Sequence, residues 1–580
     1  MVEDLLRKGL LAALEKIGVF DDDLDIQLEK PRDRSHGDLS TNLALVLGGR
    51  LDRKPRELAG VIAAEVHLPR SVIHSVEIAG PGFINFRISR GHQIEMLLDL
   101  WRADGALERI RTGGNKRINV EFISANPTGP LTAVSARAGA FGMCLVRLLE
   151  AVGYDAHAEY YVNDAGLQVQ LLGRSLRAHF MKLIGEEVEF PDDAYRGRYM
   201  EIMAGELLGL DSQGVQKASS AFNDESFQRI QAPPGDARQW SALPEDESVR
   251  CFAKFALMRI LGWQRQTCRR FGLRFETWYF ESELHETKRI ERALDRLTKQ
   301  GAVFVRDGAT WFRATDYGDE QDRVVVRSDG TPTYFMADIA YHFHKFQRGF
   351  EHAIDFWGPD HHGYIQRLAG AMAALGVWPE WLEIQIVEQV SFLQDGRPLD
   401  ASRRKGQVVT MDALVDEVGA DAAKFFFLTR KPNSTLEFDL DLARDPSDVN
   451  PLSRIRSAHA RICGFFQEAE SRRIELLEPT AETLGNLESE SEWNLVRELV
   501  RLPRIIISAA EHREPARLTA YLQEIAGLYN QCHDQCQGIL AAKEDRRTAQ
   551  LHLSLLTRRV IRVVADLIGI DLPETGEKKV

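Results

Sequence analysis

The sequence predicts an α/β protein in which a parallel-sheet domain lies between an α+β domain and a helical bundle. In the middle of the chain, the apolar strand in "KRINVEFISANPTG" leads through a Gly/Pro/Asn loop to the helix "ARAGAFGMCLVRLLEAVG" and the strand "DAHAEYYV". Strand, loop, helix and strand in this order indicate a parallel sheet with ligands at the carboxyl ends of its strands. Helix and strand patterns alternate before residue 110, and helical periodicity alone continues beyond 450.

Each predicted domain has its own pattern. Residues 1–110 combine helical segments with the strand-like "SVEIAGPGFINFRIS", in which Gly80-Pro81-Gly82 marks a turn. Residues 111–450 form the parallel-sheet domain, interrupted by a polar helical insertion at about 175–265; its strands resume at "GAVFVRD", "DRVVVRS", "EHAIDFW" and "WLEIQIV". Residues 451–580 form the helical bundle. A chain of 580 residues is too long for one core, so about three or four domains are expected.

Composition excludes several classes of protein. Hydrophobic residues make up 44% and charged residues 27%, which is typical of soluble globular proteins, and no stretch reaches the ~18 consecutive apolar residues of a membrane span. A net charge of −13 argues against indiscriminate nucleic-acid binding without excluding a local basic face. The six cysteines are scattered, which favours a reducing cytoplasm. Cys532, His533 and Cys536 could share a helix face, but two buried apolar cysteines are the simpler interpretation, and we expect no metal site.

Some residues of the predicted sheet domain could carry chemistry. Tyr334 and Asp338 are four residues apart, so in a helix they share one face, where a carboxylate beside a phenol can receive a guanidinium or an amine. Taken alone, they fit a helix-surface pair better. Glu121 lies among apolar residues, where an unpaired carboxylate is unfavourable, so a salt-bridged structural residue and a ligand-binding residue are equally open interpretations. Asn126 opens the tight turn "NPTG", which suits a structural turn and a ligand loop equally.

Two further loops hold candidate residues. "GPDHHGY" includes Asp360 and His361; adjacent histidines ligate a metal poorly, so we rank nucleotide or substrate contact first and a structural role close behind. "DGRPLDASRRKGQVVT" places Ser402, Arg403, Arg404 and Lys405 in a Gly-bounded loop. A solvated surface loop is the default there, and a phosphate-clamping loop is the alternative.

Taken together, an ordered series of segments resembles arginyl-tRNA synthetases, a family of class I aminoacyl-tRNA synthetases. The series runs through nearly the whole chain: "HGDLSTNLAL", "VEIAGPGFINF", "EFISANPTGPL", "EYYVNDAG", "YRGRYM", "ADIAYHFHKFQRGF", "WGPDHHGY", "GQVVTMDALVDEVGADAAKFFF", "YLQEIAGLYNQC" and "LIGIDLPE". The resemblance implies a Rossmann-type catalytic domain, an N-terminal domain that contacts tRNA and a C-terminal anticodon-binding domain. It implies that Glu121, Asn126, Tyr334 and Asp338 cradle arginine, and that ATP and Mg²⁺ serve the reaction.

The two ATP signatures of that family are replaced. The His-x-Gly-His signature should follow "ANPTGPL", but its positions hold Thr132, Ala133, Val134 and Ser135. Both imidazoles are missing, and Val134 adds bulk where glycine leaves room for adenine. The Lys-Met-Ser-Lys signature is replaced by Asp400, Ala401, Ser402 and Arg403, so an acid stands in place of a lysine.

Two functions remain open. One is a working arginine–tRNA ligase that uses ATP and Mg²⁺ with divergent ATP-binding loops. The other is a non-ligating relative that binds L-arginine, tRNA (tRNA-Arg first) or both, and that could partner another protein. We favour the second, because two lost transition-state donors should slow adenylation by several orders of magnitude, while the arginine-facing positions are kept. Asp360 and His361 would then be residual nucleotide contacts.

Overall fold

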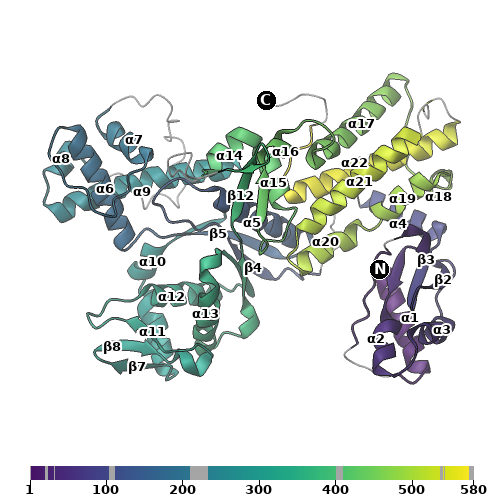
Figure 1. The fold of residues 1–580 in the computed structure, drawn as a ribbon, viewed down its shortest axis with the longest axis horizontal. Helices are drawn as coiled ribbons and strands as arrows, with labels where there is room; N and C mark the ends of the chain where they lie inside the picture. The colour runs from purple at the N-terminus through teal and green to yellow at the C-terminus, as the bar shows by residue number, and fades with distance from the viewer. Residues whose placement is uncertain are drawn as a thin grey trace.

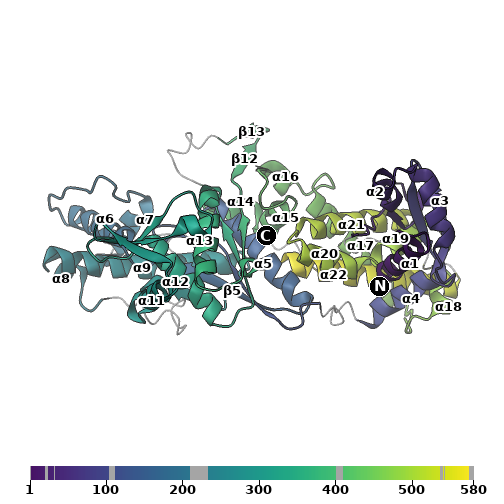
Figure 2. The ribbon, with the colours of Figure 1, turned by 90° about the horizontal axis from the view of Figure 1, so that it is seen from below.

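The computed structural model describes residues 2–19, 24–31, 33–103, 112–209, 233–399, 409–535, 540 and 543–573. Figures 1 and 2 show an elongated molecule with its centre in a twisted sheet. The N-terminal domain lies below the helical bundle at one end, and helices α6 to α9 lie at the other end. Among the described residues, no helix combines the length and apolar character required to cross a bilayer.

The central sheet has five strands in the order β11-β10-β4-β5-β6, and every neighbouring pair is parallel. This confirms the predicted fold class. Its strands are β4 (Arg117–Glu121), β5 (Asp155–Val162), β6 (Thr277–Phe280), β10 (His352–Trp357) and β11 (Leu382–Ile386). From β4 the chain adds strands first on one side and later on the other, so the strand order reverses between β4 and β10. Ligands of open α/β sheets bind at the carboxyl ends of the strands at such a reversal.

Helix α5 (Ala133–Ala151) packs closely on this sheet. A methyl group at Gly142 would overlap the ring of Phe122, which is fully buried just beyond β4. Glycine therefore permits the close approach of helix and strand. Helices α12 (Tyr334–Gln347) and α13 (His362–Ala374) flank β10 in the sequence and contact each other.

Helical and antiparallel segments interrupt the parallel sheet. The predicted insertion contains α6 (Leu167–Leu183), α7 (Arg198–Leu207), α8 (Ala237–Ser241) and α9 (Glu245–Arg270). Further helices α10 (Glu281–Glu286) and α11 (Arg289–Lys299) follow β6. After β11 come β12 (Val390–Gln394), β13 (Arg397–Pro398), α14 (Met411–Val418), α15 (Ala420–Phe427), β14 (Leu436–Asp439) and α16 (Leu440–Arg444), the three strands forming a separate small sheet.

Two predicted strands do not join the central sheet. "GAVFVRD" and "DRVVVRS" become β7 (Val303–Arg306) and β9 (Arg323–Val326), which pair antiparallel with β8 (Ala309–Phe312) between them. Asp307 and Gly308 both have positive φ, at 52° and 74°, and form the tight turn between β7 and β8. Such an Asp-Gly pair is a strong hairpin signal, so local turn chemistry decides against the expected sheet.

The N-terminal domain is α+β as expected. Its sheet has the order β1-β3-β2, with β2 (Ile73–Ala79) and β3 (Phe83–Ile88) antiparallel across the Gly80-Pro81-Gly82 turn and β1 at Leu39–Thr41. Its helices are α1 (Val2–Lys16), α2 (Leu43–Arg50), α3 (Pro55–Glu65) and α4 (Arg90–Arg102). The C-terminal domain is helical throughout its described residues: α17 (Pro451–Ser471), α18 (Ala481–Leu484), α19 (Glu490–Leu499), α20 (Leu502–Glu511), α21 (Ala516–Gln535) and α22 (Glu544–Ile568).

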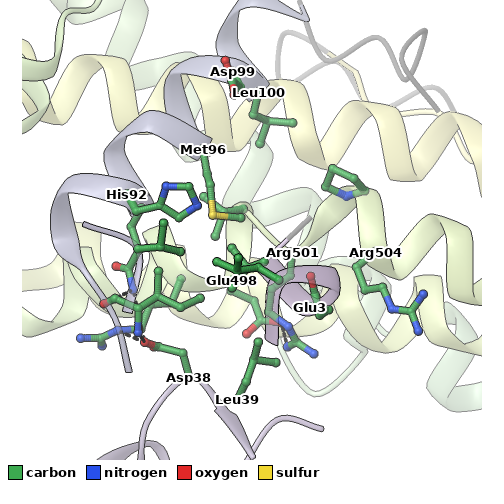
Figure 3. A pocket seen from close by; sticks show the side chains of 18 of the residues that line it. Glu3, Asp38, Leu39, His92, Met96, Asp99, Leu100, Glu498, Arg501 and Arg504 are labelled. Carbon is green, nitrogen blue, oxygen red and sulfur yellow. Dashed lines mark hydrogen bonds and ion pairs between the residues drawn. The ribbon is translucent and has the colours of Figure 1, made fainter. Parts of the chain in front are cut away.

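A cavity of about 930 Å³ separates the N-terminal domain from the bundle. Figure 3 shows Asp38, Leu39 and Met96 on its N-terminal side, opposite Glu498 and Arg501. Ion pairs cross between the two domains, from Lys30 Nζ to Glu498 Oε2 at 2.8 Å and from Arg497 Nε to Asp38 Oδ1 at 3.2 Å. Ion pairs thus join the two terminal domains around a largely apolar cavity.

Candidate functional site

A row of three carboxylates crosses three neighbouring strands of the central sheet. Asp355 on β10 is the register partner of Glu121 on β4, which is in turn the partner of Glu159 on β5. All three are buried, and like charges placed directly opposite one another in a sheet repel. The row therefore requires cations nearby.

Helix α12 supplies those cations at intervals of three residues: His342, Lys345 and Arg348, the last at its C-cap. Lys345 Nζ lies 2.5 Å from Glu121 Oε2 and 2.8 Å from Asp355 Oδ1. His342 Nε2 lies 2.8 Å from Asp355 Oδ2, and Arg348 donates two hydrogen bonds of 2.7 Å to Glu159. Three acids on the sheet thus face three bases on the helix.

The cluster sets the charges of its members. Burial opposes ionisation of Asp355, but Lys345 and His342 lower its pKa to about 2. Burial likewise opposes protonation of His342, yet the hydrogen bond and charge of Asp355 raise its pKa. Burial raises the pKa of Glu121, and Lys345 opposes that rise. Burial thus opposes the charge of each of these groups, and the opposite charges of its partners favour it.

The two oxygens of Glu121 have different hydrogen-bond partners. Its Oε2 accepts from Lys345, and the Tyr341 hydroxyl lies 2.7 Å from both Glu121 Oε2 and Glu159 Oε1, whereas Glu121 Oε1 accepts from Ser124 Oγ at 2.8 Å. A carboxylate oxygen has two lone pairs, so Oε1 keeps acceptor capacity. The salt-bridged interpretation of Glu121 and the ligand interpretation are thus compatible.

The turn after β4 is strained. Ile123 has φ of 70° and Ser124 has φ of 41°, both in the left-handed region. A β-branched residue there is an outlier, and such strain costs roughly 1–3 kcal/mol per residue. Ser124 Oγ accepts from the Tyr161 backbone N–H at 3.0 Å while it donates to Glu121. This hydroxyl fixes the strained turn beside the carboxylate.

A second acidic group consists of Asp338 on α12 and Glu281 directly after β6. Asp338 Oδ2 accepts a 2.5 Å hydrogen bond from the Tyr364 hydroxyl, and burial raises the pKa of Asp338. Glu281 starts α10 at the carboxyl end of β6; burial raises its pKa to about 7, with Asp338 and Asp164 adding to the rise and a Tyr161 hydrogen bond opposing it. Burial, together with the negative charges of Glu281, Asp338 and Glu121, raises the pKa of the Tyr161 hydroxyl well above its usual value. These carboxylates therefore border one region, which suits a cationic ligand.

The other two residues that are predicted to bind arginine, Tyr334 and Asn126, lie at the protein surface. Tyr334 and Asp338 share a face of α12, as the spacing predicts, and the Tyr334 ring is 53% exposed. Its hydroxyl would lie 3.5 Å from a Cβ at Gly166. Asn126 is exposed, and its carbonyl oxygen accepts from the Gln264 side chain at 3.2 Å and from the Thr128 N–H at 2.8 Å. The turn is thus fixed through its backbone, which leaves the Asn126 side chain at the surface.

The replaced first signature forms the expected strand–loop–helix. Thr132 caps α5, and its Oγ1 accepts from the Ser135 N–H. Thr132 also bridges Thr410, and Ala133 N–H donates to the Val409 carbonyl at 2.9 Å. The loop therefore lies against the residues that follow the second signature, although Asp400, Ser402 and Arg403 fall outside the described residues. Val134 and Ser135 are partly exposed at the start of the helix.

Arg137, the first basic side chain after this loop, does not face a phosphate site. It is fully buried, and its guanidinium donates to the carbonyls of Glu388 (2.8 Å), Gln389 (3.3 Å), Lys431 (3.0 Å) and Ser434 (2.7 Å). Burial lowers its pKa to about 10, so it stays charged at neutral pH. Arg137 is a structural clamp.

The loop after β10 follows the second of the two strands, β4 and β10, between which the strand order reverses. Asp360 and His361 lie in a short 3-10 helix (Pro359–His361), and both are exposed. The His361 ring lies 5.9 Å from that of Trp357. Within the described ranges, no three His, Cys, Asp or Glu side chains are grouped to hold a metal ion. Cys532 is buried in α21, and Cys536 lies outside the described residues.

Sequence reasoning missed Lys345, Tyr341 and Glu281. Glu281 directly follows a strand, and the rule that ligands meet strand ends could have identified it. Lys345 and Tyr341 lie in a helix with mixed character, where only the register of β4 and β10 reveals their partners.

Comparisons with known proteins agree with this architecture. Residues 100–436 match the catalytic domain of class I (R) tRNA synthetases, residues 4–88 the arginyl tRNA synthetase N-terminal domain, and residues 455–575 the DALR anticodon binding domain. The chain is 39% identical to the arginine–tRNA ligase of Syntrophotalea carbinolica over 95% of each chain. It is 38% identical to that of Moorella thermoacetica over 96% of this chain and 94% of the relative.

A solved structure shows the same fold. Thermus thermophilus arginyl-tRNA synthetase superposes with a TM-score of 0.75 over 99% of this chain and 100% of that one, at 20% identity. With a catalytic-domain model matching more than half of the chain, and relatives similar along nearly all of it, the protein belongs to the arginyl-tRNA synthetase family.

Proposed function

We propose that this protein is an arginine–tRNA ligase. The observation that carries the proposal is a group of largely buried carboxylates near the strand reversal, Glu121 at the end of β4, Glu281 directly after β6 and Asp338 on α12, in a chain whose relatives bear that name. Those relatives favour the ligase alternative over the non-ligating function that the replaced signatures suggested, and no finding supports a loss of ATP activation.

In this proposal arginine is held at both cationic ends. Asp338 receives the guanidinium, with Glu281 beside it, because both are desolvated carboxylates in one region. Glu121 receives the α-ammonium through Oε1, the oxygen left by Lys345 and Tyr341. Tyr334 covers the rim, and Asn126 contacts the amino-acid backbone from the turn after β4.

The proposed reaction has two steps. An α-carboxylate oxygen of arginine attacks the α-phosphorus of ATP, and pyrophosphate leaves as arginyl-adenylate forms. A hydroxyl of the 3′-terminal ribose of tRNA then attacks the arginyl carbonyl, and AMP leaves. Mg²⁺ would accompany the ATP phosphates, as it usually does. We assign no protein ligands to it, and Asp360 and His361 remain the candidate nucleotide contacts.

The ATP loop keeps its backbone but not its side chains. The positive end of the 19-residue helix α5 still opens at this loop. The bridge from Thr132 to Thr410 brings the first signature position against the segment that follows the second signature in the sequence. Arg403, Arg404 and Lys405 are the basic residues that could replace the missing charge. The proposal therefore requires activation through backbone and loop cations, at a rate below that of a synthetase with both imidazoles.

ATP–pyrophosphate exchange with arginine, with and without tRNA, tests the ligase function. We expect exchange that requires arginine and falls in Asp338→Ala, whose arginine affinity should drop by ~2 kcal/mol. Exchange indistinguishable from that without enzyme, together with intact arginine binding by calorimetry, would refute the ligase and leave the non-ligating function.

Restoring the signatures provides a second arm of the test. Thr132→His, Val134→Gly and Ser135→His combined with Asp400→Lys should raise exchange. Each lost donor is worth roughly 10²–10³ in rate. The single variant Val134→Gly tests whether the bulk of this side chain at the adenine position limits the exchange rate of the wild-type protein.

We further propose that tRNA, with tRNA-Arg first, binds across the N-terminal domain and the bundle, the two regions that match tRNA-synthetase and anticodon-binding models. Affinity should fall as salt rises, as counterion release requires. Deleting residues 451–580 should weaken binding more than changing Lys or Arg residues near residue 240. A gel shift with bulk tRNA at low salt measures both. The scattered spacing of the cysteines supports the cytoplasm as the proposed location.

A further inference from the structure

The helical insertion α6 to α9 holds the loop that connects β4 to α5. Three backbone carbonyls of this strand-end loop, residues 123–131, accept hydrogen bonds from side chains of the insertion. We propose that Tyr199 on α7 and Gln264 on α9 are positioning residues that fix the strand-end loop for the binding of ATP. This inference rests on the proposed ligase function.

Tyr199 lies against the middle of the strand-end loop. Its hydroxyl donates to the Thr128 carbonyl at 2.6 Å, and a methyl group on Gly129 would lie 3.5 Å from that hydroxyl. A methyl group on Gly197 would overlap the Tyr199 ring, so the glycine leaves room for the ring in this position. Burial raises the pKa of Tyr199 to about 12, and the hydroxyl therefore stays a donor at neutral pH.

Gln264 binds the same loop on both sides of Thr128. Its side chain is buried, and Nε2 donates to the carbonyls of Asn126 at 3.2 Å and Gly129 at 2.9 Å. Both partners are acceptors, which fixes the orientation of the amide. Gln264 Oε1 lies 3.1 Å from the hydroxyl of Tyr160 on β5. Gln264 thus connects the loop to the sheet as well as to the insertion.

The insertion is a firm support because it shares a core with the sheet. Buried side chains of α7 and α9, among them Met200 and Ile260, pack in one cluster with Trp278 of β6. The far end of the strand-end loop has a separate support, since the Met411 N–H donates to the Leu131 carbonyl at 2.8 Å. The insertion therefore fixes the part of the loop that the segment around Met411 does not reach.

These contacts predict a selective defect in ATP binding. The strand-end loop leads directly into the first ATP signature, which begins at Thr132. A loop without its supports has to be ordered when ATP binds, and this ordering lowers affinity. Once ATP is bound the loop is in place, so KM rises while kcat changes little. Residues that only stabilise the fold would lower the melting temperature and leave the KM for ATP unchanged.

The test is ATP–pyrophosphate exchange by the full chain carrying Tyr199→Phe, which removes one hydroxyl and no other atom. We expect the KM for ATP to rise about fivefold, as suits the loss of one hydrogen bond, while kcat and the KM for arginine stay within about twofold of the wild type. Gln264→Glu keeps the size of the side chain but places a carboxylate against two carbonyl oxygens, so its KM for ATP should rise further.

Tyr195→Phe is the matched control. Tyr195 precedes α7, and its printed-range hydrogen bonds, from its N–H to Ser175 and from its carbonyl to His179, use the backbone alone. This variant should keep the wild-type KM for ATP. Circular dichroism checks that each variant is folded, and Tyr199→Phe decides alone if Gln264→Glu does not fold.

The outcomes separate the inference from the proposed function. A higher KM for ATP at nearly unchanged kcat supports the inference. An unchanged KM in folded Tyr199→Phe, an equal rise for ATP and arginine, or the same rise in Tyr195→Phe overturns it. A wild type without exchange refutes the ligase, and the affinity for ATP measured by calorimetry then replaces KM with the same expected loss. A wild type that binds no ATP refutes both.

Discussion

Replacing Arg137 with methionine should loosen the catalytic domain where two segments meet α5. The guanidinium donates four hydrogen bonds to backbone carbonyls, two in residues 388–389 and two in residues 431–434. At about 1 kcal/mol for each hydrogen bond lost, the local stability should fall by roughly 4 kcal/mol. Methionine keeps the apolar length of the side chain, so the effect isolates the four donors.

Hydrogen–deuterium exchange of backbone amides is the suitable assay, because a chain with several domains does not unfold in one step. Amides in β12 and β14, which follow the tethered carbonyls, should exchange faster by orders of magnitude in Arg137→Met. Arg137→Lys, with three donors, should recover part of the protection. Arg259→Met removes a half-buried ion pair with Glu206 and should leave β12 and β14 unchanged. Equal protection in wild type and Arg137→Met would refute the clamp.

Three other predictions follow from the structure. Because burial raises the pKa of Glu281 to about 7 and a nearby cation favours its ionised form, arginine binding should release protons at neutral pH and strengthen as pH rises to about 8. Calorimetry in buffers of different ionisation enthalpy measures this proton release, and Glu281→Gln should abolish it. Gly142→Ala should destabilise by roughly 1–3 kcal/mol through overlap with Phe122, whereas Gly464→Ala, on an open helix face, should stabilise by up to about 1 kcal/mol; equal melting shifts would contradict the packing argument. The pKa of Glu383, which burial alone would raise, is lowered from 4.5 to about 2 by its hydrogen bonds and by the nearby Arg513, so this carboxylate should contribute roughly 3 kcal/mol above pH 4.5 and lose that contribution as pH falls towards 2. Comparing the melting of wild type and Glu383→Gln across this range tests it.

Much of the fold follows from local patterns in the sequence. The strand–loop–helix around Asn126 and the turn at Gly80-Pro81-Gly82 both form where apolar runs and turn residues predict them. The strands around Asp307 form, but the prediction that they join the parallel sheet is wrong. An antiparallel hairpin and a parallel strand have similar apolar runs, and only the turn distinguishes them.

The site was less predictable than the fold. Tyr334 and Asp338 share a helix face, which spacing alone indicates. Lys345 reads as an ordinary solvated lysine, because its two carboxylate partners are 224 and 10 residues away in sequence. Tertiary register decides which charges meet, and no local pattern contains that information.

The facing rows of acids and bases constrain how this protein can evolve. Glu121, Asp355 and Glu159 on the sheet are matched by His342, Lys345 and Arg348 on α12. Changing one member leaves a buried opposite charge without its partner, which costs roughly 3–5 kcal/mol, whereas exchanging both partners for apolar residues can be neutral. Substitutions should therefore be inherited in pairs, and these six positions should covary among relatives. An α12 transplanted from a relative would function only if its three matching acids came with it.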